Sequence, residues 1–316
     1  MFLVRMKAIQ LFSPAKVNLY LRVLGRRPDG FHDLLSLVCP LDFGDRMGLE
    51  LHGNEGHDVL KCDEPNLPTD GTNLIIQAID LFRLRHPFTA QVRVQLDKKI
   101  PMGAGLGGGS SNAAATLWGL NELVGKPFQI EQLMEMAAEL GSDCPLFLQG
   151  GAAIMRGRGE RIEPLDRKTA ALLEGRKLLL VMSGIHISTP WAYGALSARD
   201  GLAVSSKEAE LGLAAFCAGR KTLEQVLHND FEQVAYEKYV ALPAARAELA
   251  ASGIGPVLLS GSGSAMFALL SDSGKEGASN STIRGLRQAF REEFGLVNTT
   301  LTPFFPAPFK LREGVN

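Results

Sequence analysis

The most informative stretch of the sequence is Pro101-Met102-Gly103-Ala104-Gly105-Leu106-Gly107-Gly108-Gly109-Ser110-Ser111. This glycine loop holds five glycines within seven residues, which indicates a backbone that turns sharply or approaches a ligand closely. A strand is predicted before it at Gln91–Leu96, and a helix after it from Ser110 to about Gly125, where hydroxyl residues precede strong helix formers. Because the N–H groups that begin a helix attract anions, the glycine loop is predicted to bind phosphate.

Two known kinds of phosphate loop do not match it. The Walker A pattern, G-x-x-x-x-G-K-[ST], requires a lysine after its last glycine, and no glycine-lysine pair stands in that frame here. Gly103, Gly105 and Gly108 do satisfy the dinucleotide pattern G-x-G-x-x-G, but that pattern follows a fully buried parallel strand. The strand here alternates apolar and polar residues, as in an antiparallel sheet, so an NAD-dependent oxidoreductase is a weak alternative.

Upstream of the glycine loop, the pattern predicts an antiparallel pair of strands. Residues alternate between apolar and polar over Ala15–Val23, which predicts a half-buried strand with Lys16 and Asn18 on its polar face. Turn residues follow at 26–30, and Leu34–Leu41 is the second strand. Apolar residues at helical spacing predict helices at 73–83 and at 131–140.

Downstream, the sequence predicts a second unit. Lys177–Met182 is an apolar strand, 206–218 and 223–234 are helices, and 255–264 gives a strand and a tight loop. Single domains usually hold about 100–200 residues, so a chain of 316 residues is expected to form two domains. We place them at 1–167 and 168–316, in the α+β class.

Composition excludes several classes of protein. With 33 basic and 34 acidic residues interleaved, the chain has no basic surface for nucleic acid. The four cysteines lack C-x-x-C pairing and the six histidines show no ligand spacing, so no structural metal site is expected. The start has no signal-peptide core, and no stretch approaches the roughly 20 apolar residues of a membrane span. These observations predict a soluble, cytoplasmic protein with no membrane partner.

Three motifs resemble a third kind of phosphate-binding protein. PMGAGLGGGSSNAAA, beginning at Pro101, resembles the phosphate loop of the galactokinase, homoserine kinase, mevalonate kinase and phosphomevalonate kinase (GHMP) superfamily. SPAKVNL, beginning at Ser13, resembles its first motif, and SGSGSA, beginning at Ser260, its third. The resemblance implies a two-domain fold: an N-terminal domain like ribosomal protein S5 domain 2, a C-terminal ferredoxin-like α/β domain, and an active site in the cleft between them.

Within that superfamily, three further segments resemble the family of 4-diphosphocytidyl-2-C-methyl-D-erythritol kinases: AKVNL, PDGFHDL and GSDCPLF, which begin at Ala15, Pro28 and Gly141. The resemblance implies phosphorylation of the 2-hydroxyl of this cytidine diphosphate compound, with ATP and Mg²⁺, in the non-mevalonate route to isopentenyl diphosphate. Another superfamily kinase, acting on homoserine or mevalonate, and a nucleotide-binding protein without catalysis are the alternatives.

The resemblance also implies which residues act on the substrate. Asp143 matches the family's catalytic aspartate and Lys16 the lysine paired with it. As a hypothesis, Asp143 accepts or orients the hydroxyl proton, while Lys16 keeps Asp143 ionised and stabilises charge on the attacking oxygen. The competing role for Asp143 is a helix N-cap, and for Lys16 a solvated strand residue.

Further contacts follow from the same resemblance. The whole glycine loop is expected to hold the nucleotide, with Ser110 or Ser111 contacting phosphate or Mg²⁺ or else capping the helix. The other expected contacts are Asn73 and Lys98 for adenine, and Asn18, Phe31, His32, Thr189 and Tyr193 for the substrate. Phe31 stands where the family has tyrosine, so stacking on cytosine is kept but a phenolic hydroxyl is lost.

The chain's end leaves two questions open. The tail from Leu301, with Phe304, Phe305 and Phe309, packs either on the body of the protein or on a second subunit. The sequence does not indicate an oligomeric state.

Overall fold

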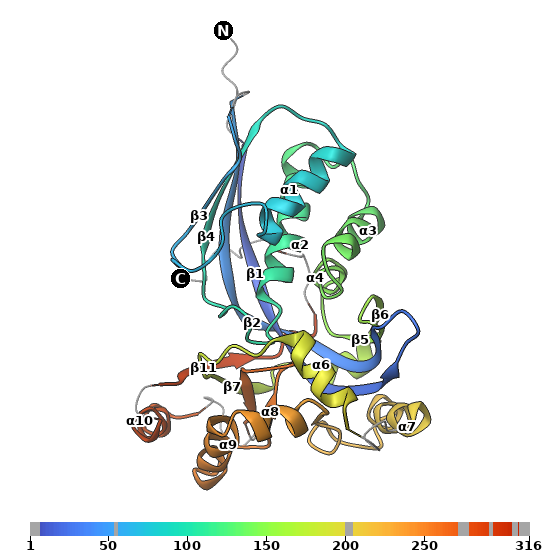
Figure 1. Ribbon diagram of the computed structural model, residues 1–316, viewed down its shortest axis with the longest axis vertical. Coiled ribbons are helices and arrows are strands. Elements are labelled where there is room, and N and C mark those ends of the chain that lie inside the picture. The colour runs from blue at the N-terminus through green and yellow to red at the C-terminus, as the bar shows by residue number, and fades with distance from the viewer. Residues whose placement is uncertain are drawn as a thin grey trace.

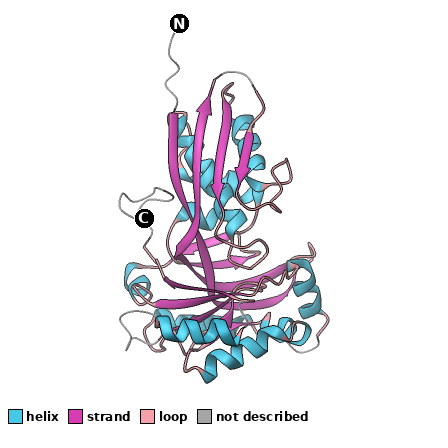
Figure 2. Ribbon diagram, turned by 90° about the vertical axis from the view of Figure 1, so that its left-hand side faces the viewer, coloured by secondary structure: helices cyan, strands magenta, loops and turns pink. Residues whose placement is uncertain are grey.

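The computed structural model describes residues 7–53, 56–199, 205–270, 278–290, 293–304 and 309. Within these residues two β-sheets lie one above the other, each with helices on one face (Figures 1 and 2). The predicted α+β architecture with two units is confirmed. No helix in the described ranges has the length and apolarity needed to cross a membrane.

The first sheet is built on two long strands. β1 (Lys7–Arg26) and β2 (His32–His52) pair antiparallel across the predicted turn, and the strand order is β3-β4-β2-β1-β8. β5 adds to β2, and β6 adds to β5. The remaining strands are β3 (Val59–Cys62), β4 (Gln91–Asp97), β5 (Ala153–Gly157), β6 (Arg161–Pro164) and β8 (His228–Asn229).

Four helices cover one face of the first sheet (Figure 1). They are α1 (Leu74–Arg85), α2 (Gly108–Leu123), α3 (Ile130–Leu140) and α4 (Cys144–Gln149). α1 and α3 agree with the predicted helices, and Gly141 ends α3 as its C-cap. A fully buried apolar core lies between these helices and β1, β2 and β4. The strand predicted before the glycine loop is β4, which pairs antiparallel with β2 and parallel with β3.

The second sheet has four antiparallel strands in the order β11-β7-β10-β9. Its members are β7 (Lys177–Met182), β9 (Val257–Leu259), β10 (Met266–Leu269) and β11 (Gly295–Thr300). The four central residues of β7 are apolar and buried on both faces: Leu178 and Leu180 face the core between the sheets, whereas Leu179 and Val181 face the core under the helices.

Helices of the second half cover the far face of this sheet (Figure 2). Those that contribute to the core on that face are α6 (Thr189–Ser197), α8 (Glu232–Lys238), α9 (Ala241–Ala251) and α10 (Asn280–Ala289). α7 (Ser206–Cys217) instead packs against β1 and β2, and α5 (Arg167–Ala171) precedes β7. The predicted boundary between residues 167 and 168 stays a prediction. Residues after it also supply β8, which pairs with β1 in the first sheet.

Two predictions were wrong in detail. The helix expected over 223–234 begins only at Glu232, because residues 223–226 form a turn and His228–Asn229 pair with β1. The strand expected to be half-buried over Ala15–Val23 is buried on both faces: Lys16 is 4% exposed and Asn18 6%. The glycine loop covers Lys16, and residues of the second half bond Tyr20 and Arg22.

The tail packs on the body of the protein at Leu301 and at Phe309. Leu301 forms a β-bridge with Leu41, and Phe309 lies fully buried in the core of the first half. Phe304 is partly exposed, and Phe305 lies outside the described residues.

Candidate active site

Lys16 is a buried cation surrounded by oxygen atoms. Its Nζ donates hydrogen bonds to Asn18 Oδ1 (2.8 Å) and to the Gly105 carbonyl (3.0 Å), and lies 3.5 Å from Asp143 Oδ2. A buried charge needs such partners, because they replace the water that it has lost. The fold therefore brings together the lysine and the aspartate that the sequence singled out, and the competing role of Lys16 as a solvated strand residue is wrong.

Asp143 occupies the N-cap position of α4 without capping it. Its backbone is already helical, with φ −85° and ψ −14°, and its side chain makes no capping hydrogen bond. The carboxylate is 37% exposed and turned toward Lys16. An exposed carboxylate next to a buried ammonium group is available to a reacting hydroxyl, as general acid–base chemistry requires.

The glycine loop leads from β4 into α2 through three left-handed residues. Gly103, Gly105 and Gly107 have φ of +62°, +75° and +73°, values that favour glycine. Gly107 is the N-cap of α2, which begins at Gly108. The predicted start at Ser110, with a hydroxyl cap, was therefore wrong by two residues: a left-handed glycine supplies the cap instead.

The second half of the chain supports the glycine loop from behind. Ala265 N donates to the Ala104 carbonyl at 3.0 Å, and Ser260 Oγ donates to the Gly105 carbonyl at 3.1 Å. The approach is so close that a Cβ on Gly105 would lie 2.0 Å from the Ser260 carbonyl oxygen. The first, second and third sequence motifs thus meet at one point, around Gly105 and Lys16.

A cavity of about 450 Å³ opens on the front of the glycine loop. Lys16, Asp143 and the start of α2 line it, and the first N–H groups of a helix have no partner within the helix. This arrangement gives the cavity a cationic ammonium group and free backbone donors. Both favour a polyphosphate.

Ser110 and Ser111 have different surroundings. Ser111 is fully buried and accepts a hydrogen bond from Ser13 Oγ at 2.7 Å, so its hydroxyl faces the protein interior. Ser110 lines the cavity in front of the glycine loop. Of the two hydroxyl groups, only that of Ser110 is placed to contact a ligand.

Asn73 and Lys98 both line this cavity but already have partners. Asn73 caps α1, accepting from Ile75 N at 2.9 Å, and donates to the Pro68 carbonyl. Lys98 Nζ lies 2.5 Å from Asp45 Oδ2, and both side chains are buried. Contact of either residue with adenine stays a prediction.

A second cavity of about 870 Å³ lies on the other side of Asp143 and contains the predicted substrate residues Phe31, His32, Thr189 and Tyr193. Asn18 lines the first cavity instead, with its amide nitrogen bonded to Ser36 Oγ.

Aromatic rings in the second cavity are paired. The His32 imidazole stacks on the Tyr193 ring at 4.9 Å between centroids, with 19° between the planes. The Arg158 guanidinium lies 4.8 Å from the centre of the Phe31 ring, which is 53% exposed. A planar base would find stacking surfaces here. Burial, and then the charge of Arg26, lower the pKa of His32, so its imidazole is neutral at pH 7.

The two cavities share a wall formed by Leu34, Ser110, Asp143, Thr189 and Tyr193. A ligand in one cavity therefore meets a ligand in the other at the Asp143 carboxylate. This is the geometry needed for transfer of a group between two substrates.

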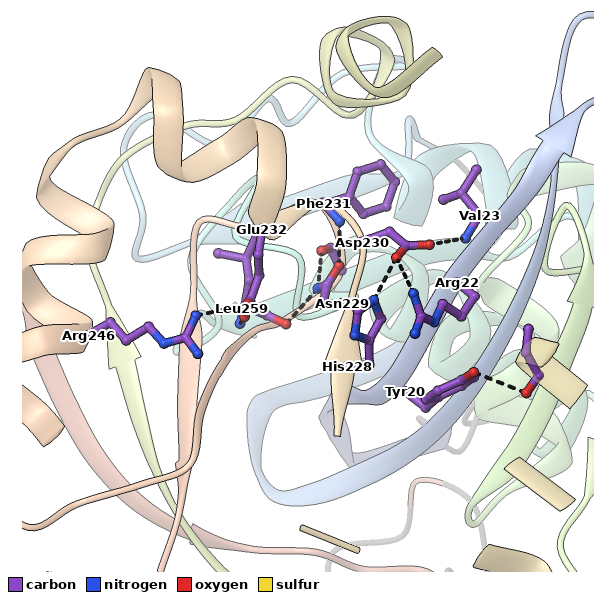
Figure 3. A network of polar contacts seen from close by, with 12 residues as sticks. Tyr20, Arg22, Val23, His228, Asn229, Asp230, Phe231, Glu232, Arg246 and Leu259 are labelled. Atoms are coloured by element: carbon purple, nitrogen blue, oxygen red, sulfur yellow. Dashed lines mark hydrogen bonds and ion pairs between the residues drawn. The ribbon is translucent and has the colours of Figure 1, made fainter. Parts of the chain in front are cut away.

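A buried polar network ties β1 to the second half beside the site (Figure 3). Asp230 accepts hydrogen bonds from Val23 N (2.8 Å), Arg22 Nη1 (3.1 Å) and His228 Nε2 (2.6 Å). Asn229 Nδ2 donates to the carbonyls of Leu259 (2.7 Å) and Gly261 (2.8 Å). Because Gly261 abuts Gly105 and Lys16, this network fixes the third motif against the glycine loop.

Sequence reasoning missed several residues that line the cavities. Arg158 lies in the turn between β5 and β6, and Ser197 is the last residue of α6, so both fall outside the segments that the sequence singled out. Phe231 packs edge-on against Tyr193, with 4.8 Å between ring centroids. The contacts of Arg158 with Phe31, of Phe231 with Tyr193 and of Ser197 with His32 join residues far apart in the sequence, and no local pattern indicates such contacts.

No cluster of three or more histidine, cysteine or acidic residues able to hold a metal ion occurs within the described part of the chain. Cys144, next to Asp143, is buried, which raises the pKa of its thiol to about 12. It is therefore a neutral packing residue and not a nucleophile.

Comparison with known proteins identifies relatives of the chain. Residues 73–151 match the family described as GHMP kinases N terminal domain. The chain is 39% identical to the 4-diphosphocytidyl-2-C-methyl-D-erythritol kinase of Protochlamydia amoebophila over 84% of this chain and 85% of that protein. It is 36% identical to the chloroplastic protein of that name from Arabidopsis thaliana, over 83% of this chain and 67% of that protein.

Solved structures give the same grouping. A crystal structure of 4-(cytidine 5'-diphospho)-2C-methyl-D-erythritol kinase has a TM-score of 0.72 and 33% identity, covering 93% of this chain and 99% of that one. The homoserine kinase of Cytophaga hutchinsonii has a TM-score of 0.68 at 18% identity, covering 98% of this chain and 99% of that one, and is similar in fold alone. The predicted GHMP-kinase fold is confirmed.

Proposed function

The chain belongs to the family of 4-diphosphocytidyl-2-C-methyl-D-erythritol kinases, and we propose that it transfers the γ-phosphate of ATP to the 2-hydroxyl of that cytidine diphosphate compound. The products are the 2-phosphate and ADP, in the non-mevalonate route to isopentenyl diphosphate. The observation that carries the proposal is the junction of the two cavities at Asp143, next to Lys16. A cytoplasmic location follows from the sequence and stays a prediction.

ATP occupies the cavity in front of the glycine loop in this proposal. Its phosphates face the N-terminus of α2, where unpaired N–H groups and the helix dipole favour negative charge. The left-handed glycines keep side chains out of this space, and support from Ser260 and Ala265 holds the loop in place before ATP arrives. Such preorganisation lowers the cost of binding.

Transfer of the phosphoryl group requires alignment more than covalent help. The bond from the γ-phosphorus to the bridging oxygen of ADP breaks, and a bond to the substrate's 2-oxygen forms. Asp143 orients the substrate hydroxyl or accepts its proton. The ammonium group of Lys16, held by Asn18 and Gly105, offsets the negative charge that develops on the attacking oxygen.

Mg²⁺ is expected to arrive with ATP. The ion usually binds one or two protein oxygens together with substrate phosphates, which suits a site without a dedicated metal cage. Ser110, whose hydroxyl lines both cavities, is the residue placed to contact it. When bound, the ion neutralises charge on the transferred phosphoryl group.

The cytidine end of the substrate occupies the larger cavity. Phe31 and Tyr193 offer stacking surfaces, and His32 offers a polar edge. Arg158 covers one face of the Phe31 ring with a delocalised cation, which suits the anionic diphosphate or the edge of a base. Thr189 lies at the shared wall, bonded to Ser262 at 2.9 Å.

An assay of ADP release tests the substrate. The cytidine diphosphate compound, homoserine and mevalonate are supplied side by side, and turnover is expected with the first. Turnover with either of the others, and none with the first, would contradict the proposal.

Replacing Asp143 tests the proposed chemistry. Asp143→Asn keeps the shape of the side chain but removes the carboxylate charge, so kcat is expected to fall by about 10²–10⁴-fold. ATP binding, measured by calorimetry, is expected to persist because the glycine loop is untouched. Near-normal turnover would remove Asp143 from its role.

A further inference from the structure

Ser197 joins the two stacked rings of the second cavity. It is the last residue of α6, and its Oγ lies 2.5 Å from His32 Nε2 and donates to the Tyr193 carbonyl at 2.8 Å. The same hydroxyl therefore touches the backbone that carries one ring and the polar edge of the other.

The two contacts of Ser197 restrict the protons on His32. A serine hydroxyl has one hydrogen to donate, and the Tyr193 carbonyl takes it. Both contacts exist together only if the short bond to His32 runs from Nε2–H to Oγ. A neutral imidazole carries one N–H, so His32 Nδ1 is then an unprotonated acceptor. Nδ1 has no hydrogen-bond partner among the described residues.

The orientation of the His32 ring determines what Nδ1 meets. The lone pair of Nδ1 lies in the plane of the imidazole, so a base bonded to it lies near that plane. The imidazole is within 19° of parallel to the Tyr193 ring. A base in this position therefore bonds His32 by its edge and lies in a plane nearly parallel to the Tyr193 ring.

We infer that Ser197 determines base specificity in this cavity, because it holds His32 in the tautomer that accepts a hydrogen bond at Nδ1. An accepting nitrogen pairs with the exocyclic amino group of cytosine, whereas uracil offers a carbonyl oxygen at that position and leaves two acceptors opposed. The inference rests on the proposed function for the identity of the nucleotide. The lowered pKa of His32 supports it, since protonation would place a hydrogen on Nδ1.

A purely structural role for Ser197 gives different expectations. Serine often bonds the carbonyl four residues earlier in its own helix, as Ser197 does with Tyr193. If that were its whole role, its removal would change stability or weaken all nucleotides alike. Base preference and the tautomer of His32 would stay the same.

Binding of CDP and of UDP by the full chain tests the inference without requiring turnover. Wild type is expected to bind CDP more tightly than UDP. In Ser197→Ala the ratio of the two affinities is expected to fall by about tenfold, because the bond from cytosine to His32 Nδ1 is no longer favoured and the two acceptors of the uracil complex are no longer opposed. Ser197→Thr keeps the hydroxyl and is expected to keep the preference. An unchanged CDP/UDP ratio in Ser197→Ala would overturn the inference.

Nitrogen NMR of the imidazole gives a second readout. His32 is assigned by comparison with His32→Gln, and is expected to carry its proton on Nε2 in wild type and to become a mixture of tautomers in Ser197→Ala. A proton on Nδ1 in wild type would overturn the inference. If wild type did not turn over the cytidine diphosphate compound but still preferred CDP to UDP, the result would count against the proposed function and not against the inference about Ser197.

Discussion

Lys16 shows how one residue connects the fold to the chemistry. Its strand position places it on the same side as Asn18, and the glycine loop closes over its ammonium group. The ammonium group keeps oxygen neighbours on Asn18, Gly105 and Asp143. These contacts leave the cation little freedom to move, so its field is directed at the junction of the two cavities.

Replacing Lys16 with methionine removes this cation while keeping most of the side-chain volume. We expect kcat to fall by about 10²–10³-fold, as for loss of a preorganised electrostatic group. Lys7→Met is the control, because Lys7 lies on the same strand, donates to the Leu123 carbonyl and is far from the cavities. Steady-state kinetics on both variants check this. Equal activities would show that Lys16 serves only the fold.

At the scale of single residues, sequence reasoning indicated the two residues that we propose take part in the reaction but not their surroundings. Lys16 and Asp143 were identified by resemblance, and their contact at 3.5 Å agrees with that pairing. Whether a polar side chain is free is set by neighbours distant in sequence. Ser111 faces inward to Ser13, and Lys98 is paired with Asp45, neither of which a local pattern could indicate.

The glycine loop is the element on which the site depends. Its glycines allow left-handed backbone conformations, which is the first need. They also allow the backbone of the glycine loop to lie close to the loop after β9, which is the second need. Gly105 meets both, with φ +75° and a Cβ position 2.0 Å from the Ser260 carbonyl oxygen. The sequence indicated the first need through the number of glycines, but the contact with Ser260 depends on how the two halves pack.

Gly105→Ala tests the second need separately from the first. Gly253 has nearly the same φ, +73°, but nothing within 4 Å of an added Cβ, so Gly253→Ala carries the backbone strain alone. Both variants are expected to lose about 1–2 kcal/mol of stability from that strain. Only Gly105→Ala is expected to raise KM for ATP, by about tenfold or more, because the glycine loop must move away from Ser260.

Thermal unfolding and ATP kinetics measure the two effects on the same samples. If Gly253→Ala raised KM for ATP as much as Gly105→Ala, the contact with Ser260 would have no part in nucleotide binding.

The misplaced helix at 223–234 illustrates what element prediction lacks. Its apolar residues do fit a helical period, and from Glu232 onward the chain is helical. Before that point, β8 pairs with β1, and the buried side chains of Asn229 and Asp230 bond loop and strand backbone. Such tertiary hydrogen bonds override local propensity.

At the scale of the whole molecule, the cleft exists because β1 and β2 belong to both halves. Their residues contribute to the core between the two sheets, together with Leu178, Leu180 and Phe267 of the second sheet. The glycine loop contributes Ala104 and Leu106 to the same core. The two-unit fold was predictable from length and motif order, but this shared core was not, since it joins residues from opposite ends of the chain.

Asp230 lies in the second half of the chain and accepts hydrogen bonds from Arg22 and Val23 of β1 (Figure 3). Removing its side chain tests whether the packing of the two halves depends on these bonds. Asp230→Ala leaves Val23 N buried without an acceptor and separates Arg22 from its partner. We expect stability in urea to fall by about 1–3 kcal/mol. Arg22→Ala is the matched control and is expected to cost less, because the Arg22 side chain is 22% exposed and Asp230 keeps His228 and Val23.

Catalytic activity is expected to fall in the same order as stability, more in Asp230→Ala than in Arg22→Ala. The segment that carries Asp230 also carries Asn229, which holds Gly261 against Gly105 and Lys16, so weakening its attachment to β1 disturbs both cavities. Asp230→Ala is therefore expected to lower kcat/KM for both substrates together, more than Arg22→Ala does. If Asp230→Ala and Arg22→Ala were equally stable and equally active, contacts elsewhere in the shared core would be sufficient to align the two halves.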